Sequence, residues 1–243
     1  IANIKPIIVA PAMNTKMWLN QAVQKNYKFL ENYNNVLTLN PSEGTLACDE
    51  IGLGKIPSND LIELAIEFIS SKNLKPICKD LINKKFLVTG GCTSEKIDAA
   101  RTITNNSSGT MGLLLAQVAR FRGADVKFIH GPLKTKKEIL EGLESYEIES
   151  STELSQAIKK EIDFCDYFIM NAAVSDFKIS SATRAKIPKS KIEDHLNSNL
   201  EIVSDILENM SKSKKNKQIF VGFCAFTGPL DEARKTIKDK IIK

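Results

Sequence analysis

The sequence predicts an α/β protein with a doubly wound, mostly parallel, Rossmann-like sheet. Short apolar runs alternate with helical patterns along most of the chain, which is typical of parallel strands joined by helices. Two of these runs are followed by pairs of small residues, Gly90 with Gly91 and Ala172 with Ala173. Small residues at strand ends let a ligand approach the backbone, so the same pattern predicts a binding site.

Composition and charge limit the class of protein. The 243 residues are 42% hydrophobic and 26% charged, as in an ordinary globular protein. The net charge of +5 suits small anionic ligands, and no basic stripe with interleaved aromatic residues indicates nucleic acid. No apolar stretch reaches the ~18 residues of a membrane span. The 5 cysteines and 2 histidines lack the spacing of a zinc site and favour a cytoplasmic protein with reduced thiols.

The first part of the chain is expected to contain strand 7–9, helix 19–30, strand 36–39 and helix 60–71. Asn14 follows the first strand and can hold a carboxylate. It can equally cap a helix whose Met17 and Trp18 enter the core. Cys48 lies in a glycine-hinged loop at residues 47–56, which is either a mobile flap carrying a proton donor or an ordinary surface loop.

Residues 72–83 combine Pro76 with mixed charge and are the best linker candidate. We therefore expect two domains, 1–75 and 76–243. The chain begins at Ile1 without a methionine and ends on a predicted helix, 231–243. We expect a fragment of a longer protein at both ends.

The second part continues the alternation of strands and helices. The strand at 86–88 leads into one long polar loop that ends at Gly109. The remaining elements are predicted as helix 111–122, strand 126–130, helix 152–162 capped by Thr152, strand 167–170, helix 201–210 and strand 219–223.

The turn at Gly90 and Gly91 and the loop with Ser107 and Ser108 predict a site for a phosphorylated ligand. Glycines let backbone N–H groups close on phosphates, and the following helix start adds unpaired donors and a positive dipole end. The alternative is a plain connection with no ligand, since glycine loops are common.

Charged residues further along extend this site. Asp176 follows the strand at 167–170 and can hold a hard cation, although it can equally cap a helix. Lys186 and Lys189 can reach phosphates, although such a pair is ordinarily solvated charge.

Several motifs of the second part carry a family resemblance. They are Thr89-Gly90-Gly91, Ile97-Asp98, Arg101, Asn105-Asn106-Ser107-Ser108-Gly109-Thr110-Met111-Gly112, Ala172-Ala173-Val174-Ser175-Asp176-Phe177, Lys186-Ile187-Pro188-Lys189 and Gly222-Phe223-Cys224-Ala225-Phe226-Thr227. Together they resemble the ligase half of bacterial phosphopantothenoylcysteine decarboxylase/phosphopantothenate–cysteine ligase, the bifunctional family that makes the cysteamine arm of coenzyme A. Thr110 stands where the family has a lysine, and Phe226 where it has a glutamate.

The resemblance implies that 4′-phosphopantothenate is joined to cysteine at the expense of CTP, through an acyl-cytidylate. Asn105 and Lys186 would then be catalytic, Arg101 and Asn105 would bind substrate, and Asp176 would hold Mg²⁺. The nucleotide would contact Gly90, Gly91, Ser107, Ser108, Ala172, Ala173, Lys186, Lys189 and Phe223.

Two motifs of the first part, residues 11–18 and 47–56, are similar to those of flavin-dependent phosphopantothenoylcysteine decarboxylases. In that family the asparagine matched by Asn14 holds the carboxylate that leaves as carbon dioxide. The cysteine matched by Cys48 is catalytic and protonates the intermediate. The family's Gly-Asp is replaced by Asp49 and Glu50, and its Met by Ile56.

This second resemblance implies that the ligase domain is preceded by the C-terminal part of a flavodoxin-like α/β decarboxylase domain. The family's flavin loops lie upstream of its asparagine motif. We therefore expect FMN on a longer native protein and none on this chain alone. The family builds its flavin site between subunits, so we also expect a homo-oligomer, with a dimer of the ligase domain and a larger assembly at full length.

A non-catalytic nucleotide-binding or dinucleotide-binding protein of the same fold is the alternative. Gly90-Gly91 does not form the Gly-x-Gly-x-x-Gly pattern, and no acid closes a second strand at the expected ribose position. No single residue encodes the choice between CTP and ATP.

Overall fold

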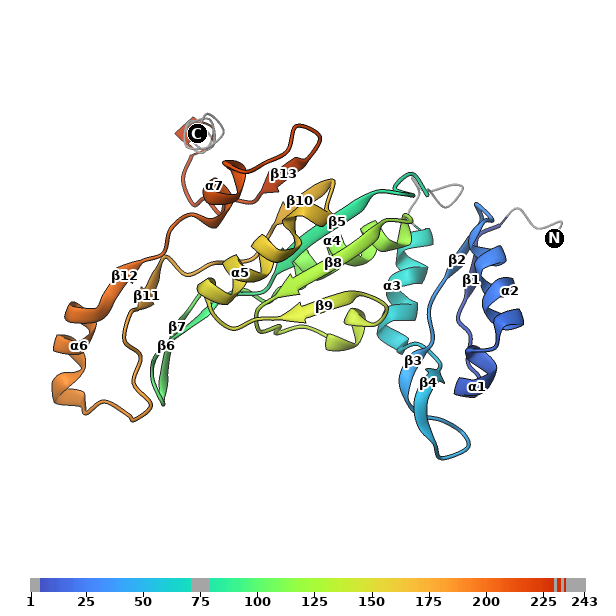
Figure 1. Ribbon diagram of the computed structural model, residues 1–243, viewed down its shortest axis with the longest axis horizontal. Helices are drawn as coiled ribbons and strands as arrows, with labels where there is room; N and C mark the ends of the chain where they lie inside the picture. The colour runs from blue at the N-terminus through green and yellow to red at the C-terminus, as the bar shows by residue number, and fades with distance from the viewer. Residues whose placement is uncertain (1–4, 71–78, 230, 233, 235–243) are drawn as a thin grey trace.

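A five-stranded parallel sheet forms the centre of the molecule (Figure 1). The computed structural model describes residues 5–70, 79–229, 231, 232 and 234. In the order β13-β10-β5-β8-β9, the strands are β13 (Ile219–Gly222), β10 (Tyr167–Met170), β5 (Lys85–Gly90), β8 (Asp125–His130) and β9 (Glu144–Glu147). The predicted parallel α/β fold is confirmed.

The strand order contains a switch point. From β5 the chain moves outward to β8 and β9, and it then returns across β5 to place β10 and β13 on the other side. In open parallel sheets, ligands bind outside the carboxyl ends of the strands where the order reverses. Here that place lies between the ends of β5 and β10.

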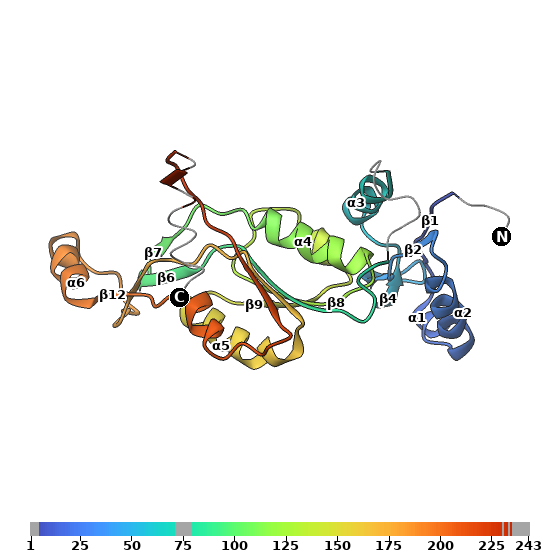
Figure 2. The same cartoon turned by 90° about the horizontal axis from the view of Figure 1, so that it is seen from above.

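Helices cover both faces of this sheet. Phe86 and Val88 of β5 pack under α4 (Thr110–Phe121), whereas Leu87 faces α5 (Ser151–Glu161) and α7 (Ile206–Ser211). Figure 2 shows α4 and α5 on opposite sides of the strands. Because successive strand residues point to opposite faces, an uninterrupted apolar run is what a sheet covered on both sides requires.

Two antiparallel pairs extend beyond the carboxyl end of the sheet (Figure 1). One pairs β6 (Ser94–Asp98) with β7 (Arg101–Thr104), and the other pairs β11 (Phe177–Ile179) with β12 (Leu200–Ile202). Between β11 and β12 lie the 3₁₀ turn η3 (Lys189–Lys191) and α6 (Ile192–Asn199).

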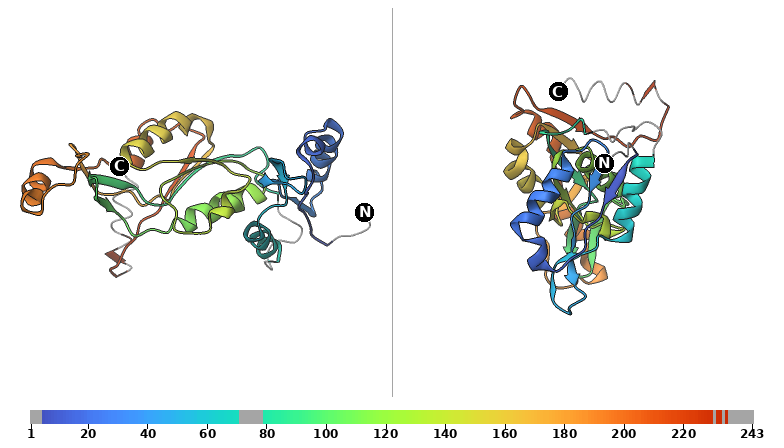
Figure 3. Two further views of the ribbon diagram at one scale, coloured as in Figure 1. Left: turned by 90° about the horizontal axis from the view of Figure 1, so that it is seen from below. Right: turned by 90° about the vertical axis from the view of Figure 1, so that its right-hand side faces the viewer.

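The N-terminal part has a two-stranded parallel sheet of β1 (Ile7–Val9) and β2 (Val36–Thr38). Its other elements are α1 (Thr15–Trp18), α2 (Gln21–Glu31), the antiparallel pair β3 (Ser42–Thr45) and β4 (Ile51–Lys55), and α3 (Asn59–Ser70). Figure 3 shows this part at one end of the molecule and α6 at the other. Phe121 of α4 joins its hydrophobic cluster of Leu37, Leu39, Leu61, Ala65 and Phe68.

Several sequence predictions of elements are wrong. The expected polar loop before Gly109 contains the β6–β7 pair, the expected loop at 47–56 contains β4, and the expected helix at 201–210 is split into the end of β12 and α7. Helix α5 is capped by Ser150, whose hydroxyl accepts from Glu153 N, and not by Thr152. Met17 is 58% exposed and does not enter the core.

Three short elements complete the fold and, like β3, β11, η3 and α6, were not predicted. They are β9 and the 3₁₀ turns η1 (Lys137–Leu140) and η2 (Ile162–Phe164). The proposed domain boundary near residue 75 and most of the expected helix at 231–243 lie outside the described residues.

Candidate functional site

The loops that follow β5 and β10 lie side by side at the switch point. The Ala173 N–H donates to the Gly91 carbonyl at 2.8 Å, and the Thr93 N–H donates to the Ala173 carbonyl at 3.1 Å. The Thr89 hydroxyl accepts the N–H groups of Asn171 and Ala172, each at 3.1 Å. The structure thus brings together four residues predicted as nucleotide contacts: Gly90, Gly91, Ala172 and Ala173.

Helix α4 begins directly against this pair of loops. A Cβ at Gly112 would lie 2.7 Å from the Thr89 carbonyl oxygen and 2.8 Å from the Gly90 Cα. Gly109 caps the helix with a φ of +77° and no side-chain hydrogen bond. Glycine at both positions therefore lets the positive end of the helix dipole approach the end of β5 closely.

Hydroxyl groups line the start of α4. The Ser107 Oγ accepts from Gly109 N and the Ser108 Oγ accepts from Thr110 N, both at 3.3 Å. The Ser108 and Thr110 hydroxyls lie 2.9 Å apart. At the position where the related family has a lysine, this chain thus has a short side chain bonded to Ser108.

Asn105 joins the loop before α4 to the loop after β10. Its Nδ2 donates to the Val174 carbonyl at 2.8 Å, and the side chain is half-buried. The neighbouring Thr104 hydroxyl donates to the Thr93 carbonyl at 2.8 Å. These hydrogen bonds hold the Asn105 amide beside the ends of β5 and β10, and its Oδ1 can still accept a hydrogen bond.

The tip of the β6–β7 hairpin holds the loop that carries Lys186. Asp98 Oδ2 accepts from Arg101 Nη1 at 2.8 Å and from Ile187 N at 3.1 Å, and Arg101 Nη1 also donates to the Ile187 carbonyl at 3.2 Å. Burial acts to raise the pKa of the Asp98 carboxyl. This effect of burial is outweighed by hydrogen bonds from the Ala100 and Ile187 N–H groups and by the charge of Arg101. The pKa of Asp98 is therefore held below its ordinary value.

Asp98 was not predicted to have a role of its own. The available signal was its place in the Ile97-Asp98 motif, three residues before Arg101. Lys186 itself is exposed and lies at the far end of the hairpin from Asn105. Strand β6 is about 13 Å long, so within one chain Lys186 does not touch the strand-end loops.

Of the remaining predicted residues, Phe223 and Asp176 follow strands of the same sheet, whereas Lys189 belongs to the loop of Lys186. Phe223 follows Gly222, which pairs with Met170 at the end of β10, and it is 45% exposed. Asp176 and Lys189 are exposed. Within the described ranges, no three His, Cys, Asp or Glu side chains gather as a metal site. A single exposed carboxylate still suits Mg²⁺, which uses one or two carboxylates together with substrate phosphates.

A second cluster lies in the N-terminal part. Asn14 Nδ2 is 3.4 Å from Cys48 Sγ and 3.5 Å from Glu50 Oε2, and Cys48 Sγ is 3.9 Å from the same carboxylate oxygen. Asn14 Oδ1 meanwhile caps α1 by accepting from Lys16 N at 2.9 Å. Asn14 therefore caps α1 and contacts Cys48 at the same time.

Backbone geometry holds the loop of Cys48 over Asn14. The Met13 N–H donates to the Gly54 carbonyl at 2.8 Å, and a Cβ at Gly52 would lie 2.4 Å from the Thr15 hydroxyl. Asp49, which stands where the similar family has glycine, has a φ of +62°. The substitution thus keeps the left-handed backbone that glycine would provide, because aspartate tolerates this region better than most residues.

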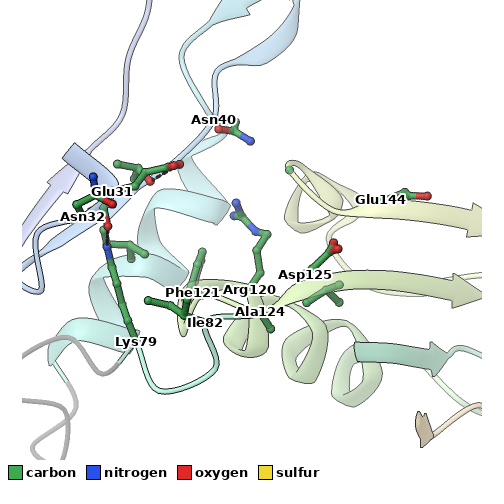
Figure 4. A pocket seen from close by; sticks show the side chains of 15 residues that line it. Glu31, Asn32, Asn40, Lys79, Ile82, Arg120, Phe121, Ala124, Asp125 and Glu144 are labelled. Atoms are coloured by element: carbon green, nitrogen blue, oxygen red, sulfur yellow. Dashed lines mark hydrogen bonds between the residues drawn. The ribbon is translucent and has the colours of Figure 1, made fainter. Parts of the chain in front are cut away.

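A cavity of about 470 Å³ is lined by residues of the N-terminal part and of the end of α4 (Figure 4). Arg120 points into it toward Asn40. Arg120 Nε donates to Gln117 Oε1 at 2.8 Å, while Nη2 is buried and has no hydrogen-bond partner among the described residues. Burial lowers the pKa of Arg120. The cavity lies at the opposite end of α4 from the strand-end loops, so it is separate from the candidate site.

Fold and site together define a doubly wound α/β protein with its candidate ligand site at a topological switch point. Residues 81–243 match the family described as DNA/pantothenate metabolism flavoprotein C-terminal domain, and residues 1–70 match the flavoprotein family. The chain belongs to the DNA/pantothenate metabolism flavoprotein family. The suspected relationship is thus confirmed.

Curated relatives support the same placement. The chain is 33% identical over 228 residues to the coenzyme A biosynthesis bifunctional protein CoaBC of Vibrio cholerae, covering 93% of this chain and 55% of that protein. It spans 54% to 60% of the length of the curated relatives it matches.

Solved structures share the fold. The crystal structure of the C-terminal domain of CoaBC has a TM-score of 0.54 at 32% identity and covers 67% of this chain and 75% of that chain. A Cab2 mutant in complex with phosphopantothenate-cysteine has a TM-score of 0.52 at 20% identity, with 74% and 76% covered. This second likeness shows the fold alone. No helix in the described ranges is both long and apolar enough to span a membrane.

Proposed function

We propose that the second part of this chain is a phosphopantothenate–cysteine ligase of coenzyme A biosynthesis. The observation that carries the proposal is the convergence at the switch point of the glycine turn after β5, the alanines after β10, Asn105 and the start of α4. The backbone N–H groups suit the phosphates of a nucleotide, and the anchored Asn105 amide suits a carboxylate held next to them.

The proposed reaction has two steps. The carboxylate of 4′-phosphopantothenate attacks the α-phosphorus of CTP, and pyrophosphate leaves to give an acyl-cytidylate. The amine of cysteine then attacks the acyl carbon and displaces CMP, forming the amide with loss of a proton. Positioning of the reactants and stabilisation of developing charge supply most of the rate enhancement in such transfers.

Each predicted residue takes a part in this scheme. Asn105 orients the pantothenate carboxylate, and Phe223 contacts the base. Arg101, at the tip of the β6–β7 hairpin, would bind substrate at the site of a second copy of the chain. Lys186 and Lys189 lie at the far end of the hairpin from Asn105, and they would neutralise phosphate charge at the site of a second copy of the chain in the proposed homo-oligomer. Backbone groups of Gly90, Gly91, Ser107, Ser108, Ala172 and Ala173 border the nucleotide. Asp176 would hold Mg²⁺, which when bound offsets the charge of the phosphates.

Labelled substrate tests the proposal directly. With phosphopantothenate carrying ¹⁸O in its carboxylate, CTP and cysteine, we expect pyrophosphate release and one ¹⁸O atom in the CMP. The same assay with ATP determines the choice of base. Release with neither nucleotide would contradict the ligase and favour a non-catalytic nucleotide-binding protein.

For the intact protein we further propose FMN-dependent decarboxylation of 4′-phosphopantothenoylcysteine to 4′-phosphopantetheine, in a cytoplasmic homo-oligomer. Asn14 would hold the departing carboxylate, and Cys48 would donate a proton. The contacts among Asn14, Cys48 and Glu50 support this arrangement. The described residues thus supply the substrate side of this reaction.

The division into a decarboxylase portion, 1–75, and a ligase domain, 76–243, belongs to the same proposal. The visible spectrum of the purified chain tests whether the first portion binds flavin by itself. We expect no bound flavin on these 243 residues. A yellow preparation with near-stoichiometric flavin absorbance would contradict this expectation.

A further inference from the structure

Asp98 uses its two carboxylate oxygens for different contacts. Oδ1 accepts from Ala100 N at 2.7 Å and so supports the turn of its own hairpin. Oδ2 accepts from Ile187 N, 89 positions further along the chain. The residue is only 3% exposed. One buried carboxylate thus links the β6–β7 hairpin to a distant loop.

The held peptide lies next to Lys186. Asp98 accepts the N–H of Ile187, Arg101 donates to its carbonyl, and the Ile187 side chain is buried. The residues on either side, Lys186 and Pro188, are exposed. The N–H and the carbonyl of Ile187 are therefore both hydrogen-bonded, whereas the side chain of Lys186 is free to contact a ligand.

We propose that Asp98 is a positioning residue that sets the place of Lys186 by holding the Ile187 peptide, an inference that rests on the proposed ligase function. A lysine side chain with four rotatable bonds loses much rotamer freedom when it meets a phosphate. A fixed backbone restricts where its ammonium group can reach. Lys186 then meets the transferring phosphates from a defined direction without a second side chain to guide it.

Glu95 offers a matched control on the same strand. It is also buried, at 5% exposure, and its Oε1 accepts a backbone N–H, that of Ser151 at 2.7 Å. Ser151 begins α5 and is not part of the Lys186 loop. Replacing Glu95 by Gln therefore removes a comparable buried charge without touching the proposed link.

A double-mutant cycle separates positioning from general stability. The rate of pyrophosphate release at saturating CTP and phosphopantothenate is measured for Asp98→Asn, Lys186→Gln and the double variant, with melting temperatures for each. We expect Lys186→Gln to lose about a hundredfold or more and Asp98→Asn about tenfold. In the Lys186→Gln background, Asp98→Asn should cost less than about twofold. Glu95→Gln should show no such coupling to Lys186.

Additive losses in the cycle would overturn the inference, because they would show that Asp98 does not act through Lys186. Equal coupling for Glu95→Gln would overturn it as well. If Asp98→Asn does not fold, Asp98→Glu takes its place, since it keeps the charge but displaces the Ile187 peptide. Asp98→Glu should then show the same coupling to Lys186. No coupling would contradict the proposed role of the bond between Asp98 and Ile187.

The inference can be judged even if the wild-type chain releases no pyrophosphate, which would refute only the proposed ligase. Binding of inorganic triphosphate then serves as the measurement. We expect Asp98→Asn to weaken it severalfold in the wild-type background and not in Lys186→Gln. Hydrogen exchange of the 180–188 segment should also become faster in Asp98→Asn but not in Glu95→Gln. Unchanged triphosphate binding together with unchanged exchange would exclude the positioning role.

Discussion

At Asn105 a single amide connects two loops of the candidate site. Asn105→Asp removes the donor to the Val174 carbonyl and places a negative charge beside it and beside the proposed substrate carboxylate. We expect substrate-dependent pyrophosphate release to fall by about a hundredfold or more, while the circular dichroism spectrum stays that of a folded protein.

Asn106→Asp is the matched control for this change. Asn106 is exposed, and its Oδ1 accepts from Lys134 Nζ at 3.5 Å. We expect it to retain near wild-type activity. A folded Asn105→Asp variant with wild-type turnover would contradict the role given to Asn105.

Tyr27 makes the stability of the N-terminal part sensitive to alkaline pH. Burial, reinforced by the charge of Glu31, raises its pKa to about 12. Below the ordinary tyrosine pKa of ~10 both states are neutral. Above it the unfolded chain ionises while the folded one does not. The free energy of unfolding should therefore fall by up to about 1.4 kcal/mol per pH unit between roughly pH 10 and 12.

Tyr27→Phe should remove this contribution, so its unfolding free energy should depend less on pH than that of the wild type between about pH 10 and 12. Guanidinium titrations at several pH values measure the slope. Tyr33→Phe, at a 38% exposed tyrosine, provides the control. Parallel pH slopes for wild type and Tyr27→Phe would show that the Tyr27 hydroxyl titrates normally.

Among the elements, those with strong local patterns could be predicted from the sequence. Strands β5 and β10 are apolar runs closed by small residues, and their carboxyl ends mark the site. Strand β9 could not be recognised, because it is a polar edge strand whose four residues are all exposed. The link from Asp98 to Ile187 spans 89 positions. This link depends on how the β6–β7 hairpin packs against the segment between β11 and β12, and no local sequence pattern predicts that packing.

Helix α4 depends on close contact between Gly112 and β5. An added Cβ would meet the Thr89 carbonyl oxygen, the Gly90 Cα and Asn171 Oδ1 at 2.7, 2.8 and 3.0 Å. Two of these are backbone atoms that cannot move aside independently. We expect Gly112→Ala to destabilise the protein by about 1–3 kcal/mol and to weaken CTP binding, as measured by thermal unfolding and calorimetry.

Gly44→Ala is the comparison for Gly112→Ala. An added Cβ there would meet only the flexible side chain of Lys55, at 3.0 Å. We expect little change in either stability or CTP binding. Equal effects of the two substitutions would mean that the helix–strand approach at Gly112 is not critical.

At the scale of the whole molecule, Glu141 ties the N-terminal part to the second part. Its Oε2 accepts from the Ser42 hydroxyl at 2.6 Å and from Ser58 N at 2.8 Å. An ion pair between Lys136 and Asp60 crosses the same junction. Glu141→Ala should therefore loosen the attachment by about 2–3 kcal/mol without disturbing the switch-point loops.

Trp18 makes this measurable, because the chain's only tryptophan is buried in the N-terminal part. In the wild type, tryptophan fluorescence and circular dichroism should follow one unfolding transition. In Glu141→Ala the fluorescence transition should come at lower denaturant. Glu138→Ala, at an exposed side chain of the same turn, should leave the two transitions coincident. Coincident transitions in Glu141→Ala would rule out the attachment role.

Helix α4 constrains where insertions and deletions can be accepted. It starts at the strand-end loops and finishes at Phe121, which packs into the N-terminal cluster. Its 12 residues span about 18 Å. One inserted residue would rotate everything beyond it by about 100° and carry Phe121 out of that cluster. Side chains on its outer face can change freely between relatives, whereas the number of residues in α4 cannot change without separating the candidate site from the junction.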